Sequence, residues 1–156
     1  MATKKTKSKK ARPRPRAKAR QRPGARSQPE TLRLREVTPS FTATDLQRSI
    51  AFYRDVLGFV VGEEWREDGA LLGCEMRAGS VTFMLNQDDF AKGRDRQKGV
   101  GSRLRCQTAQ DLDRLAAEVK ARGGALDQEP QLMAWGERQF MITDPDGFKL
   151  TFVQTT

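Results

Sequence analysis

The chain has 156 residues, a formal net charge of +9 and no histidine. This length fits one ordinary domain with an appendage. No run of about 18 apolar residues is present, so we expect no membrane-spanning segment. The lack of histidine removes the commonest transition-metal ligand.

A basic tail is predicted over residues 1–31. Residues 1–30 contain twelve of the 29 Lys and Arg residues and only one acidic residue, Glu30, so their net charge is +11 and that of the remaining chain is −2. The tail has four prolines and no Val, Ile, Leu, Phe, Tyr, Trp or Cys. It is predicted to be disordered because it has too little apolar surface to bury. Its composition does not fit a secretory signal or a transit peptide.

The first module of the folded part is predicted over residues 34–87. The segment "LREVTPSFTAT" alternates like a strand, and Asp45 then caps a helix that ends at Gly58. One stripe of that helix is apolar: Leu46, Ile50, Tyr53 and Leu57. Three predicted strands follow, "FVVGEEW", "ALLGCEMRA" and "SVTFMLN". Residues 87–99 have no period and many charges, which predicts a connecting loop.

The second module, residues 100–154, repeats this order. A strand, "SRLRCQTA", precedes a helix that Asp111 caps and that ends before Gly123. Its apolar stripe is formed by Leu112, Leu115, Ala116 and Val119. The strands "ALDQEPQLM", "ERQFMIT" and "GFKLTFVQ" complete the set. The turn Asp144-Pro145-Asp146-Gly147 precedes the last of them, with φ fixed at the proline and positive φ available at the glycine.

The two modules also align in sequence. Residues 40–59 laid over residues 106–125 give seven identities in twenty positions, including the capping Asp45 and Asp111. We therefore predict an internal duplication and an α+β fold of two paired β-α-β-β-β modules over residues 32–156. Such a fold forms a mixed sheet with helices on one face, and its other face can curve into a cup.

Cys74 and Cys106 are the two cysteines of the chain. They lie in separate predicted strands without metal-ligand spacing, which favours buried thiols in a reducing cytoplasm and leaves a disulfide open. A catalytic thiolate is not expected, because the chain has no histidine to activate one.

The segments "TATDLQRSIAFYRDVLGF" and "DPDGFKLTFVQ" resemble the vicinal oxygen chelate superfamily, which includes glyoxalase I, extradiol dioxygenases and bleomycin resistance proteins. The resemblance covers about residues 34–154. It implies paired modules, commonly in a homodimer, and a cup in which metal-dependent members bind a divalent ion through four side chains.

The resemblance places those four positions at Thr38, Met84, Leu104 and Thr151. Thr38 and Leu104 each lie seven residues before a capping aspartate, Thr151 replaces the final glutamate, and Met84 is its counterpart, with Phe83 one position away. None of the four offers the nitrogen or carboxylate donors that a metal needs, so we expect no metal and no cofactor. A relocated site formed by Glu63, Glu64, Glu67 or Glu75 is the alternative.

The cup lining is predicted from strand alternation and the resemblance together. The candidate ligand-binding residues are Thr38, Ser40, Thr42, Met84, Leu104, Cys106, Trp135, Arg138 and Thr151. Trp135 is expected at the rim, and Arg138 is a candidate cation for an anionic or planar ligand. No titratable pair lies near the former metal position, so no catalytic residue is assigned.

Three functions stay open at this stage. We favour a metal-independent, homodimeric protein that binds an unidentified small molecule in the cup or in a dimer groove, similar in kind to bleomycin resistance proteins. The alternative is a glyoxalase-like lyase, isomerase or dioxygenase with an altered site. A third hypothesis is a dimeric domain whose tails bind nucleic acid non-specifically through residues 4–26.

Overall fold

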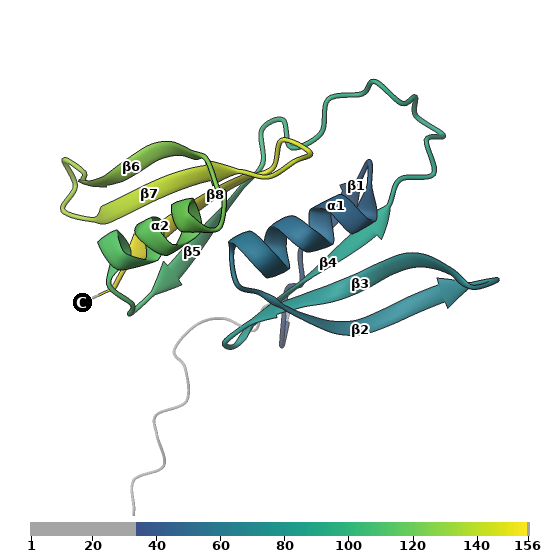
Figure 1. The fold of residues 1–156 in the computed structure, drawn as a ribbon, viewed down its shortest axis with the longest axis horizontal. Helices are drawn as coiled ribbons and strands as arrows, with labels where there is room; N and C mark the ends of the chain where they lie inside the picture. The colour runs from purple at the N-terminus through teal and green to yellow at the C-terminus, as the bar shows by residue number, and fades with distance from the viewer. Residues whose placement is uncertain (1–33, 156) are drawn as a thin grey trace, which may run out of the picture. The chain divides into compact units, whose positions relative to one another are not determined.

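The computed structural model describes residues 34–155, so the predicted disorder of residues 1–31 falls outside the described residues. Glu36–Thr156 forms one compact unit (Figure 1). Among the described residues, no helix is long and apolar enough to cross a membrane.

Each module has the order strand, helix, strand, strand, strand. The first consists of β1 (Ser40–Ala43), α1 (Leu46–Ala51) continued by a π-helical turn η1 (Phe52–Val56), β2 (Val60–Glu67), β3 (Ala70–Ala78) and β4 (Val81–Gln87). The second consists of β5 (Arg103–Thr108), α2 (Leu112–Ala121), β6 (Leu126–Leu132), β7 (Arg138–Thr143) and β8 (Lys149–Gln154). This order confirms the predicted α+β class with paired β-α-β-β-β modules.

The predicted helix caps are also confirmed. Asp45 Oδ1 accepts a hydrogen bond from Arg48 N at 3.0 Å, and Asp111 Oδ1 accepts one from Arg114 N at 2.8 Å. Gly58, just beyond the end of the first helix, has a φ of 81°. The first strand is shorter than predicted and begins at Ser40, directly after Pro39, which has no N–H to donate to a strand ladder.

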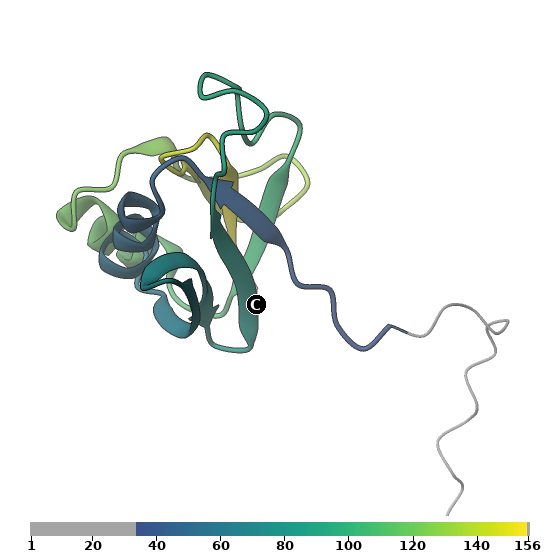
Figure 2. The same cartoon turned by 90° about the vertical axis from the view of Figure 1, so that its right-hand side faces the viewer.

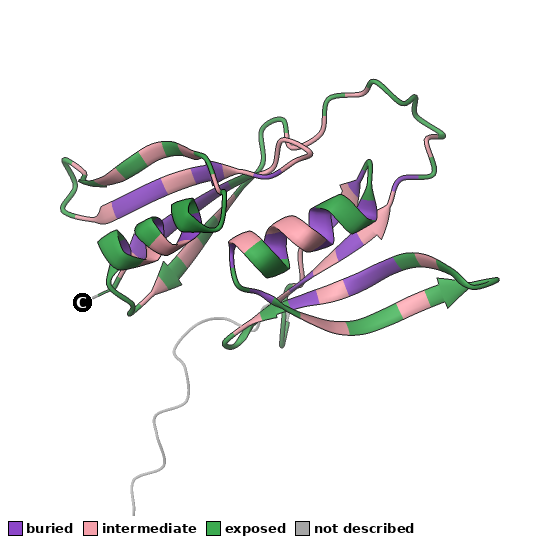
Figure 3. Cartoon of the chain, in the orientation of Figure 1, coloured by how far each residue is buried: buried purple, intermediate pink, exposed green. Residues whose placement is uncertain are grey.

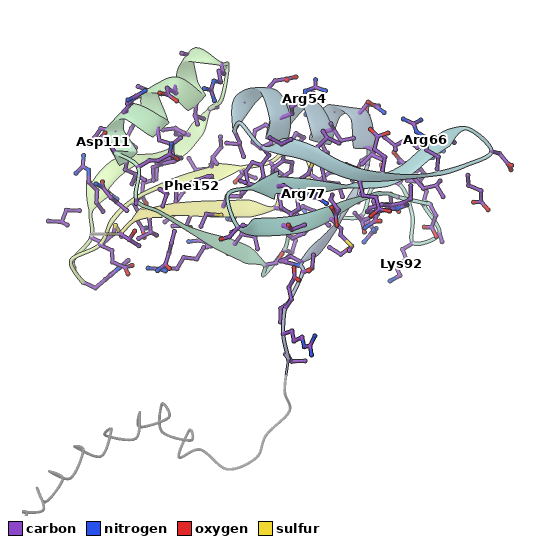
Figure 4. All side chains as sticks on the ribbon, turned by 90° about the horizontal axis from the view of Figure 1, so that it is seen from below. Arg54, Arg66, Arg77, Lys92, Asp111 and Phe152 are labelled. Atoms are coloured by element: carbon purple, nitrogen blue, oxygen red, sulfur yellow. The ribbon has the colours of Figure 1, made fainter. Side chains whose placement is uncertain are left out.

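The strands form two mixed sheets of identical topology, in the orders β1-β4-β3-β2 and β5-β8-β7-β6. The first strand of each module is parallel to the fourth, and the remaining pairs are antiparallel. Both helices lie on the same side of the strands (Figures 2 and 4). We call that side the helix face and the opposite side of the two sheets the open face.

The hydrophobic core fills the helix face of both sheets. Figure 3 colours the ribbon by burial. In β4 the buried Phe83 and Leu85 alternate with half-buried open-face residues, whereas in β8 the open-face residues Thr151 and Val153 are buried as well. Tyr53 lies at the centre of the first half and makes edge contacts with Phe59 and Phe83. Cys74 and Cys106 form no disulfide, and burial raises the pKa of each thiol to about 11. Neither thiol is a thiolate at neutral pH.

The Asp-Pro-Asp-Gly turn of the second module is bonded to the first module. Asp144 Oδ1 accepts the backbone N–H groups of Asp146 and Phe148 at 2.9 and 2.8 Å, which shapes the turn. Asp144 Oδ2 accepts the Tyr53 hydroxyl at 2.9 Å. Burial raises the pKa of both groups. One buried carboxylate therefore shapes the turn and joins the modules.

Asp146 forms the second connection at the same turn. Its carboxylate accepts Thr44 N at 2.8 Å and the Ser49 hydroxyl at 3.0 Å. Burial raises the pKa of Asp146, but these hydrogen bonds and the charge of Lys98 outweigh that effect and lower it overall. Lys98, whose side chain is 3% exposed, also pairs with Asp88 at 2.9 Å. This pairing lowers the pKa of Asp88 to about 2. The loop predicted over residues 87–99 is therefore bound, near the C-terminal end of the loop, to the turn that contains Asp146.

Replacing Tyr53 with Phe tests the connection through Asp144. Asp144 Oδ2 would lose the hydrogen bond that Tyr53 donates, while both backbone bonds to Oδ1 would remain. We expect the free energy of unfolding to fall by about 1.5–3 kcal/mol, the usual value for a hydrogen bond to a charged group. Urea denaturation provides the measurement. The exposed Thr38 hydroxyl, bonded to Glu36, provides the control Thr38→Val, which should cost less than about 0.5 kcal/mol. Equal effects would contradict a structural role for the Tyr53 hydroxyl.

A matched pair of glycines tests the contact between loop and turn. Gly99 and Gly101 both have positive φ, 68° and 75°. A Cβ at Gly99 would lie 2.1 Å from Gly147 O, whereas one at Gly101 would meet nothing within 4 Å. Both alanine variants carry backbone strain of about 1 kcal/mol or more, but Gly99→Ala also forces the loop off the turn. We expect a clearly lower melting temperature for Gly99→Ala than for Gly101→Ala. Similar melting temperatures would show that the loop does not need this contact.

Candidate functional site

The two modules are equivalent strand by strand, but not at the spacing that the sequence alignment used. Asp88 N donates to Ala43 O and Thr155 N donates to Thr108 O, each at 2.8 Å, which makes Ala43 and Thr108 equivalent. One residue separates Ala43 from the capping Asp45, whereas two separate Thr108 from Asp111. The offset between modules is therefore 65 residues in the first strand and 66 in the helix.

This extra residue corrects the prediction for Leu104. The counterpart of Thr38 in the second module is Arg103, one position before the predicted Leu104. In the parallel ladder Leu104 pairs with Leu150, and both residues pack on the helix-face core. The predicted cup-facing position of Leu104 is therefore wrong.

The prediction for Cys106 is wrong for the same reason. Cys106 pairs with Phe152 on the helix face and packs against the core. Neighbouring positions in a ladder share a face, so the open-face residues of β5 are those that alternate with Leu104 and Cys106, namely Arg103, Arg105 and Gln107.

In the first module, the structure brings several predicted residues together on the open face. Ser40 pairs with Met84, and Thr42 pairs with Asn86. Asn86 Nδ2 donates to Ser40 Oγ at 2.7 Å. Sequence reasoning did not select Asn86, although the alternation of "SVTFMLN" places it on the face of Met84. Thr38 precedes β1, and its hydroxyl donates to Glu36 at 3.0 Å.

Arg138 does not belong to the open face. Its guanidinium forms a two-pronged ion pair with Asp113 of α2, at 3.1 and 2.6 Å, and this pairing raises its pKa. Phe140, two residues later on β7, lies on the same face of the sheet as Arg138 and belongs to the core. The candidate role of Arg138 as a ligand cation is therefore corrected to an ion pair between sheet and helix.

Trp135 lies in the turn between β6 and β7 and is 63% exposed. Its Nε1 donates to Glu137 Oε2 at 3.1 Å. The other oxygen of Glu137 accepts a hydrogen bond from Arg105. Trp135 is thus connected to the open face through Glu137, a residue that sequence analysis did not identify.

Thr151 occupies the centre of the open face in the second module. It pairs with Arg105 on one side and with Met141 on the other. The residue is 5% exposed, and its Oγ1 has no hydrogen-bond partner among residues 34–155. A buried hydroxyl without a partner costs about 1–3 kcal/mol, so Thr151 is a conspicuous exception on this face.

Two arginine side chains extend across Thr151. Strand β8 lies between β5 and β7. Arg103 reaches from β5 to Met141 Sδ on β7, at 3.6 Å, and Arg105 reaches Glu137, the residue just before β7. Both side chains therefore cross β8 on the open face. Lys149, the ladder neighbour of Arg103, adds a third cation to that face.

The residues at the family's metal positions do not fit a metal ion. With the corrected spacing these positions are Thr38, Met84, Arg103 and Thr151, which include no imidazole or carboxylate and one cation. Within the described part of the chain, no three His, Cys, Asp or Glu residues form a group that could hold a metal ion. Glu75, a residue of the alternative relocated site, instead pairs with Arg77, which lowers its pKa.

A surface cavity of about 410 Å³ lies apart from this face, between the loop and the turn. Its lining includes Arg96, Lys98, Pro145 and Asp146. The charges of Lys98 and Asp146 already serve the connection between modules. We therefore place the candidate site on the open face around Thr151.

Comparison with solved structures shows the same fold at low sequence identity. A hypothetical protein, SA1046 from S. aureus, is 22% identical and has a TM-score of 0.61, with 79% of this chain and 95% of that chain covered. TioX from Micromonospora sp. ML1 is 18% identical with a TM-score of 0.63, covering 78% and 100%. A glyoxalase/bleomycin resistance protein/dioxygenase from Nocardioides is 16% identical with a TM-score of 0.62, covering 80% and 85%.

No curated protein sequence matches the chain. The family described as the Glyoxalase/Bleomycin resistance protein/Dioxygenase superfamily matches residues 36–152, nearly the whole described part. Together with the paired modules and their sheet order, this match shows that the chain belongs to the glyoxalase/bleomycin resistance protein/dioxygenase superfamily.

Proposed function

We propose that this protein binds a small molecule on the open face without a metal ion and without catalysing a reaction. The observation that supports this most is Thr151, whose buried hydroxyl has no partner in the described part of the chain and stands where metal-dependent members of the family have a carboxylate ligand. A ligand that accepts or donates one hydrogen bond there would remove the cost of the unpaired group.

The charges at the former metal positions support the absence of a metal. A divalent cation at this place would lie beside Arg103 and near Arg105 and Lys149, all on the same face. Like charges at a few ångströms repel strongly where water is partly excluded. Two carboxylates of this face are engaged in ion pairs, Glu75 with Arg77 and Glu137 with Arg105, and the thiol of Cys106 lies on the helix face. Ligand binding without catalysis accounts for the cations at the metal positions and for the carboxylates held in ion pairs.

Metal analysis tests this proposal. We expect protein purified without chelators to contain far less than one equivalent of Zn, Ni, Mn or Fe, and added metal to leave the melting temperature unchanged. The four-site variant Thr38→His, Met84→Glu, Arg103→His and Thr151→Glu restores donor types at the corrected positions and should gain metal-dependent stabilisation. Stoichiometric metal in the natural sequence would overturn the proposal and favour the alternative of an enzyme with an altered site.

The charge distribution along the chain supports a second candidate function, nucleic-acid binding by residues 4–26 of a dimeric, cytoplasmic protein. Residues 1–30 carry a net charge of +11, and the rest of the chain carries −2. Such a segregated polycation binds phosphate backbones by releasing counterions, whatever the base sequence.

Neutralising part of the tail tests the second candidate. Replacing Lys4, Lys5, Lys7, Lys9 and Lys10 with Gln should weaken binding to duplex DNA and reduce the salt slope, d log K/d log [salt], by up to about 4.5. Neutralising five exposed cations of the domain is the control: Arg48, Arg54, Arg66, Lys92 and Arg114. Light scattering gives the mass of the assembly in each case. Equal losses of DNA affinity in the two variants would contradict DNA binding by the tails. A monomeric mass would contradict a dimer.

A further inference from the structure

The open face of the second module contains a compact group of cations. Arg103, Arg105 and Lys149 all lie on it around Thr151. Among residues 34–155, Arg105 has a carboxylate partner, Glu137, whereas neither Arg103 nor Lys149 forms an ion pair. The group therefore has three positive charges against one negative charge, on the face opposite the core.

The two arginines are well placed to act on one ligand group. Both cross β8, and Thr151 lies on that strand beneath them. Met141, the ladder neighbour of Thr151 on β7, is in contact with Arg103. A guanidinium donates several hydrogen bonds in a fixed plane, which suits the paired oxygens of a carboxylate or the oxygens of a phosphate. The Thr151 hydroxyl can supply one more donor to the same group.

Glu137 already provides such a carboxylate. One of its oxygens accepts from Arg105 and the other from Trp135 Nε1 at 3.1 Å. The side chains of Arg105 and Glu137 are 43% and 38% exposed, so the ion pair between them is weak and can be exchanged for another. An anion from solution can thus replace Glu137 at Arg105, and the bond to Trp135 then loses its present geometry.

We propose that Arg103, Arg105 and Thr151 bind the carboxylate or phosphate group of an anionic ligand, and that Glu137 occupies Arg105 until the ligand displaces it. This inference rests on the proposed function, because it assigns the ligand class of the same face. It also gives Trp135 a defined role, as the residue whose environment changes when Glu137 is displaced.

Direct titration tests the proposal. The probes are inorganic phosphate, benzoate and benzyl alcohol, the last being a neutral counterpart of benzoate. Binding is measured by calorimetry on the natural sequence and by Trp135 fluorescence in a Trp65→Phe background. We expect phosphate or benzoate to bind saturably and to give a larger signal than chloride at equal ionic strength. We expect no binding of benzyl alcohol.

Variants then assign the binding to this cluster. Arg103→Gln and Arg105→Gln should each weaken anion binding about tenfold or more, as expected for the loss of a hydrogen bond between charged groups. Glu137→Gln should strengthen it about threefold or more, because the competing carboxylate is gone. Thr151→Val should weaken it without loss of stability, since its hydroxyl makes no hydrogen bond to any of the residues 34–155.

Arg138→Gln is the matched control. Arg138 is an arginine of the same module in an ion pair of similar exposure, but it lies on the helix face. It should change anion affinity less than twofold. No saturable binding of either anion, or equal losses in Arg138→Gln and Arg105→Gln, would overturn the proposal.

The remaining outcomes separate this proposal from the function on which it rests. If benzyl alcohol binds, and Thr151→Val abolishes that binding while both arginine variants retain it, the anionic class is wrong and metal-independent binding on the open face stands. Stoichiometric metal in the natural chain, by contrast, would overturn the proposed function together with the anion site.

Discussion

The buried carboxylate of Asp144 is the constraint on which the arrangement of the two modules depends. One of its oxygens shapes the turn before β8, and the other accepts the hydroxyl of Tyr53 from the first helix. A buried carboxylate must be fully hydrogen-bonded, so neither the turn nor the helix can shift without exposing its charge to an apolar surrounding. The position of β8, and with it that of Thr151, follows from this requirement.

The duplicated frame retains its geometry while its two open faces differ in chemistry. Met84 and Thr151 hold equivalent places, each paired with the first strand of its module. Their neighbours there are Ser40 in the first module and Arg105 in the second. Sheet topology depends on the core residues of the helix face, so open-face residues can change without loss of the fold. The same scaffold can therefore lose a metal site and acquire a cationic surface.

Local signals allowed much of this fold to be predicted from sequence. Asp45 and Asp111 cap their helices because short acidic side chains satisfy free N–H groups, and the turn at Asp144 follows from its proline and glycine. The face of β5 could not be predicted, because one additional residue before α2 reverses the side on which each strand residue lies. Two of the seven identities, Thr42 with Thr108 and Ala43 with Ala109, lie before the helices at an offset of 66, whereas the strands are equivalent at 65, so these matches point to the wrong face. The partnership of Arg105 with Glu137, 32 positions apart, depends on tertiary contact alone.

The corrected register changes the chemistry that the face can perform. With Leu104 on the open face, the surface around Thr151 would be apolar, and a neutral ligand would bind by desolvation alone. With Arg103 there instead, a cation stands at the position where related enzymes bind their ion. A positive charge cannot replace a metal ligand, but it can replace the metal, because both attract the oxygens of an anionic group. On the proposed function, the arginine would keep the oxygen-binding character of the site without the Lewis acid that drives a reaction in metal-dependent members.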